Sequence, residues 1–240
     1  MSSTRNSHLG ISLAGAAMAL VLSACGGDKS TTDAKDGEAN TGSNSALPAN
    51  DSAVSADKLN LADGPDVCFS AIAKHLGADA KVSEITSFFS AGSDIDGSAK
   101  EPQGQLKICT VDYQDPANPK KLIGTRLNVA TGTFAEPHQI ELSVSGDAAA
   151  FNLEDYLIPL SQVDAAAVAA LFESEKAAIE GAYSKHAWTG VRLMPPGPFS
   201  DVPTLRIEFE GRLASNDIKK NGWASVSADG KTIVKNNLLP

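Results

Sequence analysis

The chain has 240 residues, with 20 Lys and Arg against 29 Asp and Glu, a formal net charge of −9 at pH 7. An acidic surface repels polyanions. The composition therefore argues against binding nucleic acid or anionic lipid headgroups through charge, and it leaves a basic partner open.

The N-terminus has the pattern of an export signal. Residues 1–8 are polar with one charge, Arg5, and residues 9–24 are apolar and rich in small side chains. This stretch is too short for an ordinary transmembrane helix, which predicts a signal peptide over 1–24. Removing Arg5 with the signal leaves 19 basic against 29 acidic residues, a mature net charge of −10.

The end of this signal, Leu22-Ser23-Ala24-Cys25, resembles the lipobox of bacterial lipoproteins. The resemblance implies that Cys25 becomes the mature N-terminus and carries two or three acyl chains, enough for a lasting membrane anchor. Gly26 stands where the family's inner-membrane retention signal has Asp, which implies the outer membrane, although Asp28 lies close by. The alternative is an ordinary cleaved signal with a chance cysteine.

The segment that follows is predicted to be a tether. Residues 25–64 comprise the lipidated cysteine and a stretch rich in Ser, Ala, Asp, Gly and Asn, without aromatic residues or a sustained apolar period. Such a segment buries too little surface to offset its ordering entropy, so we expect it to be disordered. Residues 65–240 remain for one large domain or two small ones.

Two cysteines remain in this second part, Cys68 and Cys109. In an exported, oxidising compartment their natural pairing is a disulfide with each other. A zinc site is the alternative, but no His or second Cys lies at ligand spacing around either thiol.

Helix signals and strand signals alternate along residues 65–240. Pro65 and Gly77 bracket one short amphipathic helix, and a second is predicted from Ser161 to about His186. Period-two alternation predicts strands, clearest at Leu205, Ile207 and Phe209. Noisier strand segments are 82–89, 105–114, 121–129, 138–144, 188–194, 222–228 and 231–235.

These elements predict an α+β fold with two similar helix-on-antiparallel-sheet subdomains, at 65–146 and 147–240. A constant offset of 98 residues aligns the two helix starts and sets Cys109 on Ile207. Cys109, Val111 and Tyr113 are then expected to face their helix, which leaves Leu106 and Ile108 on the outer face. A tandem repeat and two unrelated α+β segments both stay open.

The final hairpin, Val226–Ile233, and its counterpart Val129–Phe134 resemble those of PepSY-type envelope domains. The resemblance implies small noncatalytic modules that restrain peptidases or bind other envelope components.

No catalytic residue, cofactor site or metal site is assigned. His75 and His186 are expected near helix C-termini, where a cation meets the helix dipole favourably. Glu136-Pro137-His138 offers two metal ligands, but a pair on a loop is typical of a solvated turn. Asp94–Gly97 is similar to the start of a calcium loop, without the closing Glu, so a polar loop is expected.

One loop carries a binding hypothesis. Pro195, Pro196 and Pro198 stand beside Phe199, and preset φ angles reduce the entropy that such a segment loses on binding. The alternative is a stiff crossover between strands with Phe199 in the core.

The sequence thus predicts an outer-membrane lipoprotein that acts as a noncatalytic periplasmic binding module, as an inhibitor of, or an immunity protein against, an envelope hydrolase. The alternatives are a structural accessory of an envelope or secretion complex, and an enzyme without a recognisable motif.

The lipid anchor is directly testable. Cys25→Ser should release the protein from the membrane and abolish metabolic labelling with radioactive palmitate, because the acylated sulfur is lost. Label on the variant, or none on the wild-type protein, would contradict the anchor.

Overall fold

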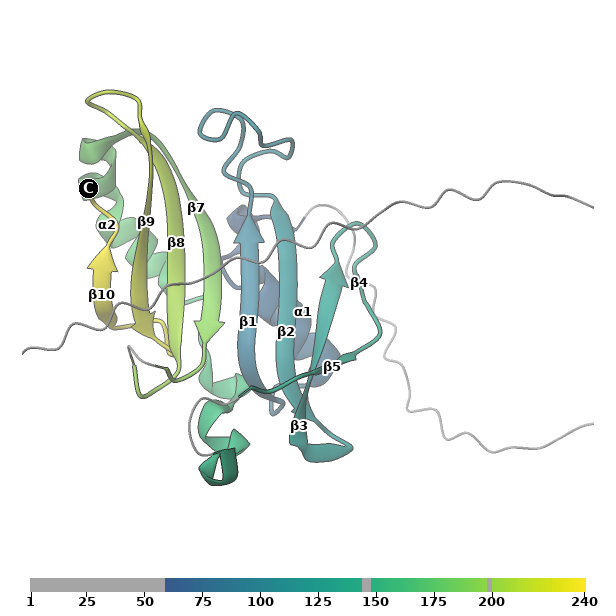
Figure 1. The fold of residues 1–240 in the computed structure, drawn as a ribbon. Coiled ribbons are helices and arrows are strands. Elements are labelled where there is room, and N and C mark those ends of the chain that lie inside the picture. The colour runs from purple at the N-terminus through teal and green to yellow at the C-terminus, as the bar shows by residue number, and fades with distance from the viewer. Residues whose placement is uncertain (1–58, 144–147, 198–199) are drawn as a thin grey trace, which may run out of the picture. The chain divides into compact units, whose positions relative to one another are not determined.

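The protein has an α+β fold, seen in a computed structural model that describes residues 59–143, 148–197 and 200–240. Two helices accompany a ten-stranded antiparallel sheet (Figure 1). Helix α1 spans Val67–Leu76 and helix α2 spans Val168–Ala182. The predicted α+β class is confirmed. Cys25 and the rest of residues 1–58 lie outside the described residues.

The strands form two runs along the chain. The first run comprises β1, Lys81–Phe89; β2, Leu106–Asp115; β3, Asn118–Asn128; β4, Thr133–Phe134; and β5, His138–Ile140. The second comprises β6, Ile158–Pro159; β7, Tyr183–Met194; β8, Thr204–Leu213; β9, Lys219–Ser227; and β10, Ile233–Asn237.

The two runs join into one sheet. Its order is β10-β9-β8-β7-β1-β2-β3-β4, with β5 paired to β3 and β6 paired to β1. The joint is the antiparallel pair β1–β7, in which Ser87 lies opposite Val191 and Phe88 opposite Gly190. The halves predicted as two subdomains therefore share a continuous sheet, and residues 144–147 at their predicted boundary lie outside the described part.

Both helices cover the same face of this sheet (Figure 1). Strand residues alternate in burial, so that Leu205, Ile207 and Phe209 of β8 are buried and Arg206 and Glu208 between them are half-exposed. One core cluster contains side chains from both helices and from the central strands. Cys109, Val111 and Tyr113 are buried in the same cluster, which confirms the face predicted for them.

Corresponding elements of the two halves keep the predicted spacing. Strand β8 begins and ends 98 residues after β2. Cys109 pairs with Ser87 of β1, and Ile207 pairs with Val191 of β7 in the same relative position. The hairpins after β3 and β9 each turn through a glycine with positive φ, +70° at Gly132 and +69° at Gly230.

Leu106 departs from its prediction. It is 1% exposed and belongs to the core, although alternation from Cys109 placed it on the outer face. The pairing register shifts between Phe88, which pairs with Ile108, and Phe89, which pairs with Leu106. This irregularity turns Leu106 toward the helices, whereas Ile108 stays half-exposed on the other face.

The second helix is shorter than predicted at both ends. It begins at Val168, because Leu160–Gln162 forms a 3₁₀ turn and the backbone N–H of Asp164 donates to Ala228 O of the sheet. It ends at Ala182, and Tyr183 starts β7 at once. His186 therefore lies on a strand, where it has no helix dipole to meet, and burial lowers its pKa.

A long loop of the first half also packs against the second half. In residues 90–105, between β1 and β2, Ala91 and Ile95 pack on Ala187 of β7. In the same loop, Asp96 pairs with Lys219 of β9, with a distance of 3.1 Å between Oδ2 and Nζ. The loop thus covers one end of the second half on the face opposite the helices.

Ser87 supplies a test of the joint. Its hydroxyl is fully buried and has no hydrogen-bond partner within the described part of the chain. Because an unsatisfied buried hydroxyl costs about 1 to 3 kcal/mol, Ser87→Ala should raise the free energy of unfolding by about 1 kcal/mol in denaturant titration.

Ser90→Ala is the matched control for this change. Ser90 is equally buried, but its hydroxyl donates to Glu101 O at 2.8 Å and accepts from Gly92 N. This substitution should lower the free energy of unfolding by about 1 kcal/mol. Equal effects of the two substitutions would refute the assignment of Ser87 as unsatisfied.

Candidate binding face

The sheet face opposite α1 and α2, called the open face below, carries the candidate site. Its outward residues are mostly polar and half-exposed because the helices cover only the other face. Phe88 of β1 is an exception and lies on this face over Gly190, where a Cβ would come within 2.9 Å of its ring. Gly190 is therefore required for the two halves to approach closely at this point.

A row of alternating charges crosses the middle of the open face. Arg192 of β7 donates to Glu84 of β1 at 2.9 Å and lies 3.8 Å from Glu208 of β8. The same Glu208 carboxylate is 3.2 Å from Nε of Arg206. These four side chains are 25% to 35% exposed. Four such groups in one network fix each other's positions better than an isolated surface pair does.

Trp223 of β9 continues this row toward the edge of the sheet. The Arg206 guanidinium lies 4.3 Å from the centre of its ring, and the Lys235 ammonium of β10 lies 5.1 Å from it. Two cations on neighbouring strands therefore hold the indole through cation–π contacts.

A hollow of about 390 Å³ opens beside this indole. We call it the Trp223 groove, and its lining comprises Met194, Pro195, Gly197, Ser200, Thr204, Arg206, Trp223, Ser225, Val234 and Lys235. The lining is mainly apolar and includes two cations and no carboxylate. Its volume is in the range of small ligand sites and suits one or two side chains of a partner.

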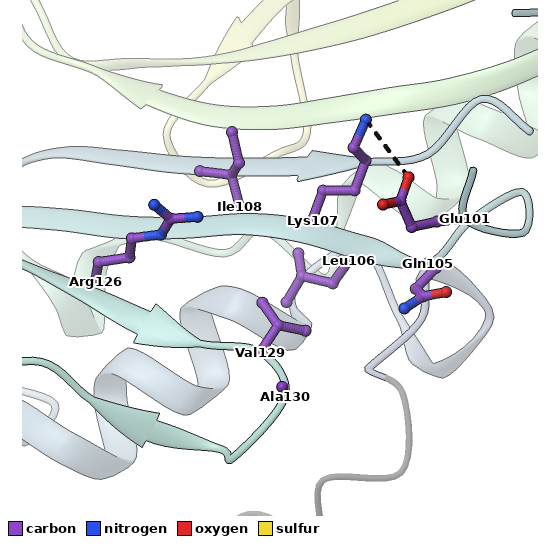
Figure 2. Close-up of a pocket in the computed structure, with 8 residues that line it drawn as sticks. All are labelled: Glu101, Gln105, Leu106, Lys107, Ile108, Arg126, Val129 and Ala130. Atoms are coloured by element: carbon purple, nitrogen blue, oxygen red, sulfur yellow. Dashed lines mark ion pairs between the residues drawn. The ribbon is translucent and has the colours of Figure 1, made fainter. Parts of the chain in front are cut away.

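A second hollow of about 480 Å³ lies on the first half (Figure 2). Its lining comprises Glu101, Gln105, Leu106, Lys107, Ile108, Arg126, Val129 and Ala130. Arg126 lies opposite Thr110 of β2, as Trp223 lies opposite Glu208 of β8. The two hollows thus occupy corresponding places, but the second has an exposed guanidinium in place of an indole and a Lys107–Glu101 pair at 3.9 Å.

Asp112 is a carboxyl of the open face whose pKa is raised. It lies opposite Glu84 across β1 and β2. Burial and the Glu84 charge raise the pKa of Asp112, and His138 partly offsets them.

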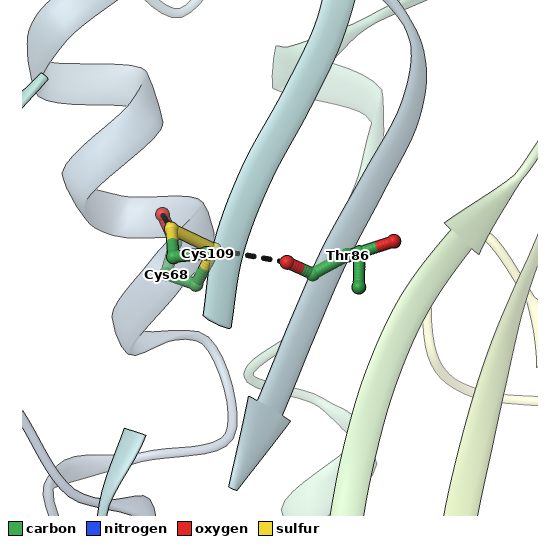
Figure 3. The surroundings of a disulfide bond; sticks show 3 residues. All are labelled: Cys68, Thr86 and Cys109. Atoms are coloured by element: carbon green, nitrogen blue, oxygen red, sulfur yellow. Dashed lines mark hydrogen bonds between the residues drawn. A yellow bond between two sulfur atoms is a disulfide. The ribbon is translucent and has the colours of Figure 1, made fainter. Parts of the chain in front are cut away.

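The predicted disulfide is present. Cys68 of α1 and Cys109 of β2 are bonded, with 5.5 Å between their Cα atoms, and both are fully buried (Figure 3). The bond fastens α1 to the core side of the sheet. It therefore has a structural place, away from the open face.

The proline-rich loop lies at the candidate site in part. Pro195 lines the Trp223 groove and Pro196 is half-exposed, whereas Pro198 and Phe199 lie outside the described residues.

The sequence analysis does not identify Trp223 and Lys235 as site residues. The alternation of inward and outward side chains along a strand places such residues on the outward face. It does not show which outward residues of neighbouring strands lie side by side.

His75 lies in the last turn of α1, as predicted, and stacks on Phe134 with ring centres 4.2 Å apart. His138 is the first residue of strand β5. Within the described ranges, no group of three or more His, Cys, Asp and Glu side chains is arranged to hold a metal ion. None of the helices described is long and apolar enough to cross a membrane.

Comparison with known proteins gave no match to a family model, to a curated protein or to a solved structure.

Asp112 generates a pH prediction. Because its pKa is raised in the folded state, the folded protein binds this proton more tightly than the unfolded chain, and stability falls as pH rises from 3.8 through the folded pKa. Asp112→Asn should therefore raise the melting temperature at pH 7, and the gain should shrink as the pH falls through the raised pKa toward 3.8.

Asp79→Asn removes the same charge from an exposed turn and controls for net charge. A gain from Asp112→Asn that is independent of pH, or equal to that of the control, would contradict a raised pKa.

Proposed function

We propose that the protein is a lipid-anchored outer-membrane lipoprotein whose globular part faces the periplasm and binds a protein partner without catalysing a reaction. The lipobox-like end of the signal at Cys25 supports the anchor. The Cys68–Cys109 disulfide is compatible with an oxidising compartment.

The observation that carries the binding role is the Trp223 groove at the end of the charged row. Trp and Arg are the residue types enriched among binding hot spots, and they contribute most in pockets that exclude water. Trp223 and Arg206 are of these residue types. Each is half-exposed, and together they border an apolar hollow, so they are in part shielded from water. The polar row around them supplies a rim that fixes orientation.

The partner we propose is an envelope hydrolase, which the protein inhibits or against which it confers immunity. A mature net charge of −10 favours a partner that is basic overall, since opposite charges accelerate encounter. A sheet face held by strand pairing suits such an inhibitor, because a prearranged surface loses little entropy on binding.

We further propose that the two halves are similar subdomains derived from one repeat. Three observations support this view. Strand β8 begins and ends 98 residues after β2, and the hairpins after β3 and β9 each turn through a glycine with positive φ. The two hollows also occupy corresponding places. The resemblance of both hairpins to PepSY-type envelope domains is in keeping with a noncatalytic role.

The proposal is tested by site-specific photo-crosslinking in intact cells. A photoreactive residue at Ser225 of the open face should give one defined crosslinked product, and the same residue at exposed Lys176 of α2 should not. The protein identified in this product, once purified, should form a stoichiometric complex with the wild-type chain in calorimetry and lose its hydrolytic activity in that complex.

Two substitutions test whether the partner binds to the open face or to the side of the sheet that the helices cover. Ser225→Lys, which places a long cation on the open face, should weaken the complex at least tenfold, a loss of about 1.4 kcal/mol. Ala177→Lys at an exposed position of α2 makes the same change in charge, and this matched control should not weaken it. Equal binding by both variants, or crosslinks from Lys176 alone, would refute the open face as the binding surface.

A further inference from the structure

We propose that the Trp223 groove binds an acidic side chain of the partner together with a neighbouring aliphatic one, the carboxylate lying between Arg206 and Lys235. This inference rests on the proposed function and names the chemistry that the groove recognises.

The charges of the lining point to a carboxylate. Arg206 contacts Glu208 through Nε at 3.2 Å, and no hydrogen bond or ion pair of its two terminal guanidinium nitrogens is found in the described part of the chain. Lys235 is exposed, and the described residues place no carboxylate against its ammonium. Both cations thus have donors available at the mouth of the groove. A carboxylate that accepts from both would form charge-assisted hydrogen bonds, the stronger kind.

The remaining lining fits an aliphatic side chain. Met194, Pro195 and Val234 border the groove beside the indole, and Val234 is 58% exposed. Covering these surfaces removes apolar area from water. The groove therefore combines one anion-binding corner with an apolar wall, which suits an acidic residue next to an aliphatic one.

The local charge differs from the charge of the whole chain. The mature chain is acidic, yet the groove lining has two cations and no acidic residue. Because charges are screened beyond about 8 Å at physiological salt, the nearby charges decide what binds inside the groove, and the two cations outnumber the Glu208 carboxylate that lies 3.2 Å from Arg206. A long polyanion would meet the acidic surface outside it, so the ligand is a single carboxylate on a protein segment.

The sheet edge beside the groove supports an extended segment. Strand β10 ends the sheet order, and all five of its residues, Ile233–Asn237, are exposed. An extended peptide that pairs with such an edge places alternate side chains on the open face, next to Lys235. Backbone pairing would supply affinity, and the groove would select the side chain.

The test observes the groove directly through its indole. The chain has two tryptophans, and Trp188 stacks on Phe172 on the helix side of the sheet. In nitrogen-15-labelled, non-lipidated Cys25→Ser protein that also has Trp188→Phe, a single indole N–H signal reports on Trp223. The probes are the peptide acetyl-Gly-Val-Asp-Leu-Gly-amide and its Asn-for-Asp version, each titrated to about 10 mM, where weak millimolar binding is visible.

The Asp peptide should shift the Trp223 signal saturably, with an affinity at least fivefold higher than that of the Asn peptide. Arg206→Gln and Lys235→Gln should each reduce the preference for Asp at least threefold, whereas Lys176→Gln on α2 should leave it unchanged. Equal affinity for both peptides, no saturable shift, or a shift that depends on protein concentration without peptide would overturn the inference. The last result would indicate self-association through this groove.

Failure of this inference can be told apart from failure of the proposed function. If the complex with the crosslinked partner persists in Arg206→Gln and Lys235→Gln but is lost in Ser225→Lys, the open face binds the partner and the carboxylate assignment is wrong. If no complex depends on any open-face residue, the proposed function fails as well.

Discussion

The antiparallel pairing of β1 with β7 is the interaction on which the rest of the structure depends. It joins two small sheets, and with both helices on one side it creates a single core and a single uncovered face. Ser87 and Val191 lie at its centre, flanked by Cys109 and Ile207. In either half alone, the strand at the joint would have a neighbouring strand on only one side. The open face is therefore a product of the joint, and a partner that binds across it would read both halves at once.

The two halves use one architecture for different chemistry. Corresponding hollows lie beside Trp223 in one half and beside Arg126 in the other, and loop 90–105 covers an end of the second half. An indole offers rigid apolar area, whereas a guanidinium offers directed donors. The edge near β10 is thus suited to anchoring a partner, and the region near β2 and β3 to orienting it. A shared architecture leaves such outward positions free to differ, because they contribute little to the core.

Local patterns predicted the elements that depend on local rules. Alternation identified β8, the Pro65 and Gly77 signals placed α1, and the export expected from the N-terminal signal predicted the pairing of Cys68 with Cys109. Properties set by the pairing register between strands were missed. Trp223, Arg206 and Lys235 are ordinary outward residues in the sequence, and only the register of β8, β9 and β10 brings them together. Alternation likewise failed at Leu106, where a register shift turned the strand. The helix-start signal at Ser161 failed because the Asp164 N–H donates to the sheet, and the helix begins only at Val168.

An uncovered sheet is a risk for any folded protein, because exposed edges and apolar surface favour aggregation. The open face limits this risk through the row from Glu84 to Arg206, and β10 does so by being short and bearing Lys235 and two asparagines. Against this polar background, the exposed Val234 and the half-exposed Trp223 are departures from the rule. They lie side by side in one groove that also contains two available cations. Apolar exposure that is clustered in this way, beside charges that would fix the orientation of a ligand, is the arrangement that the proposed binding role requires.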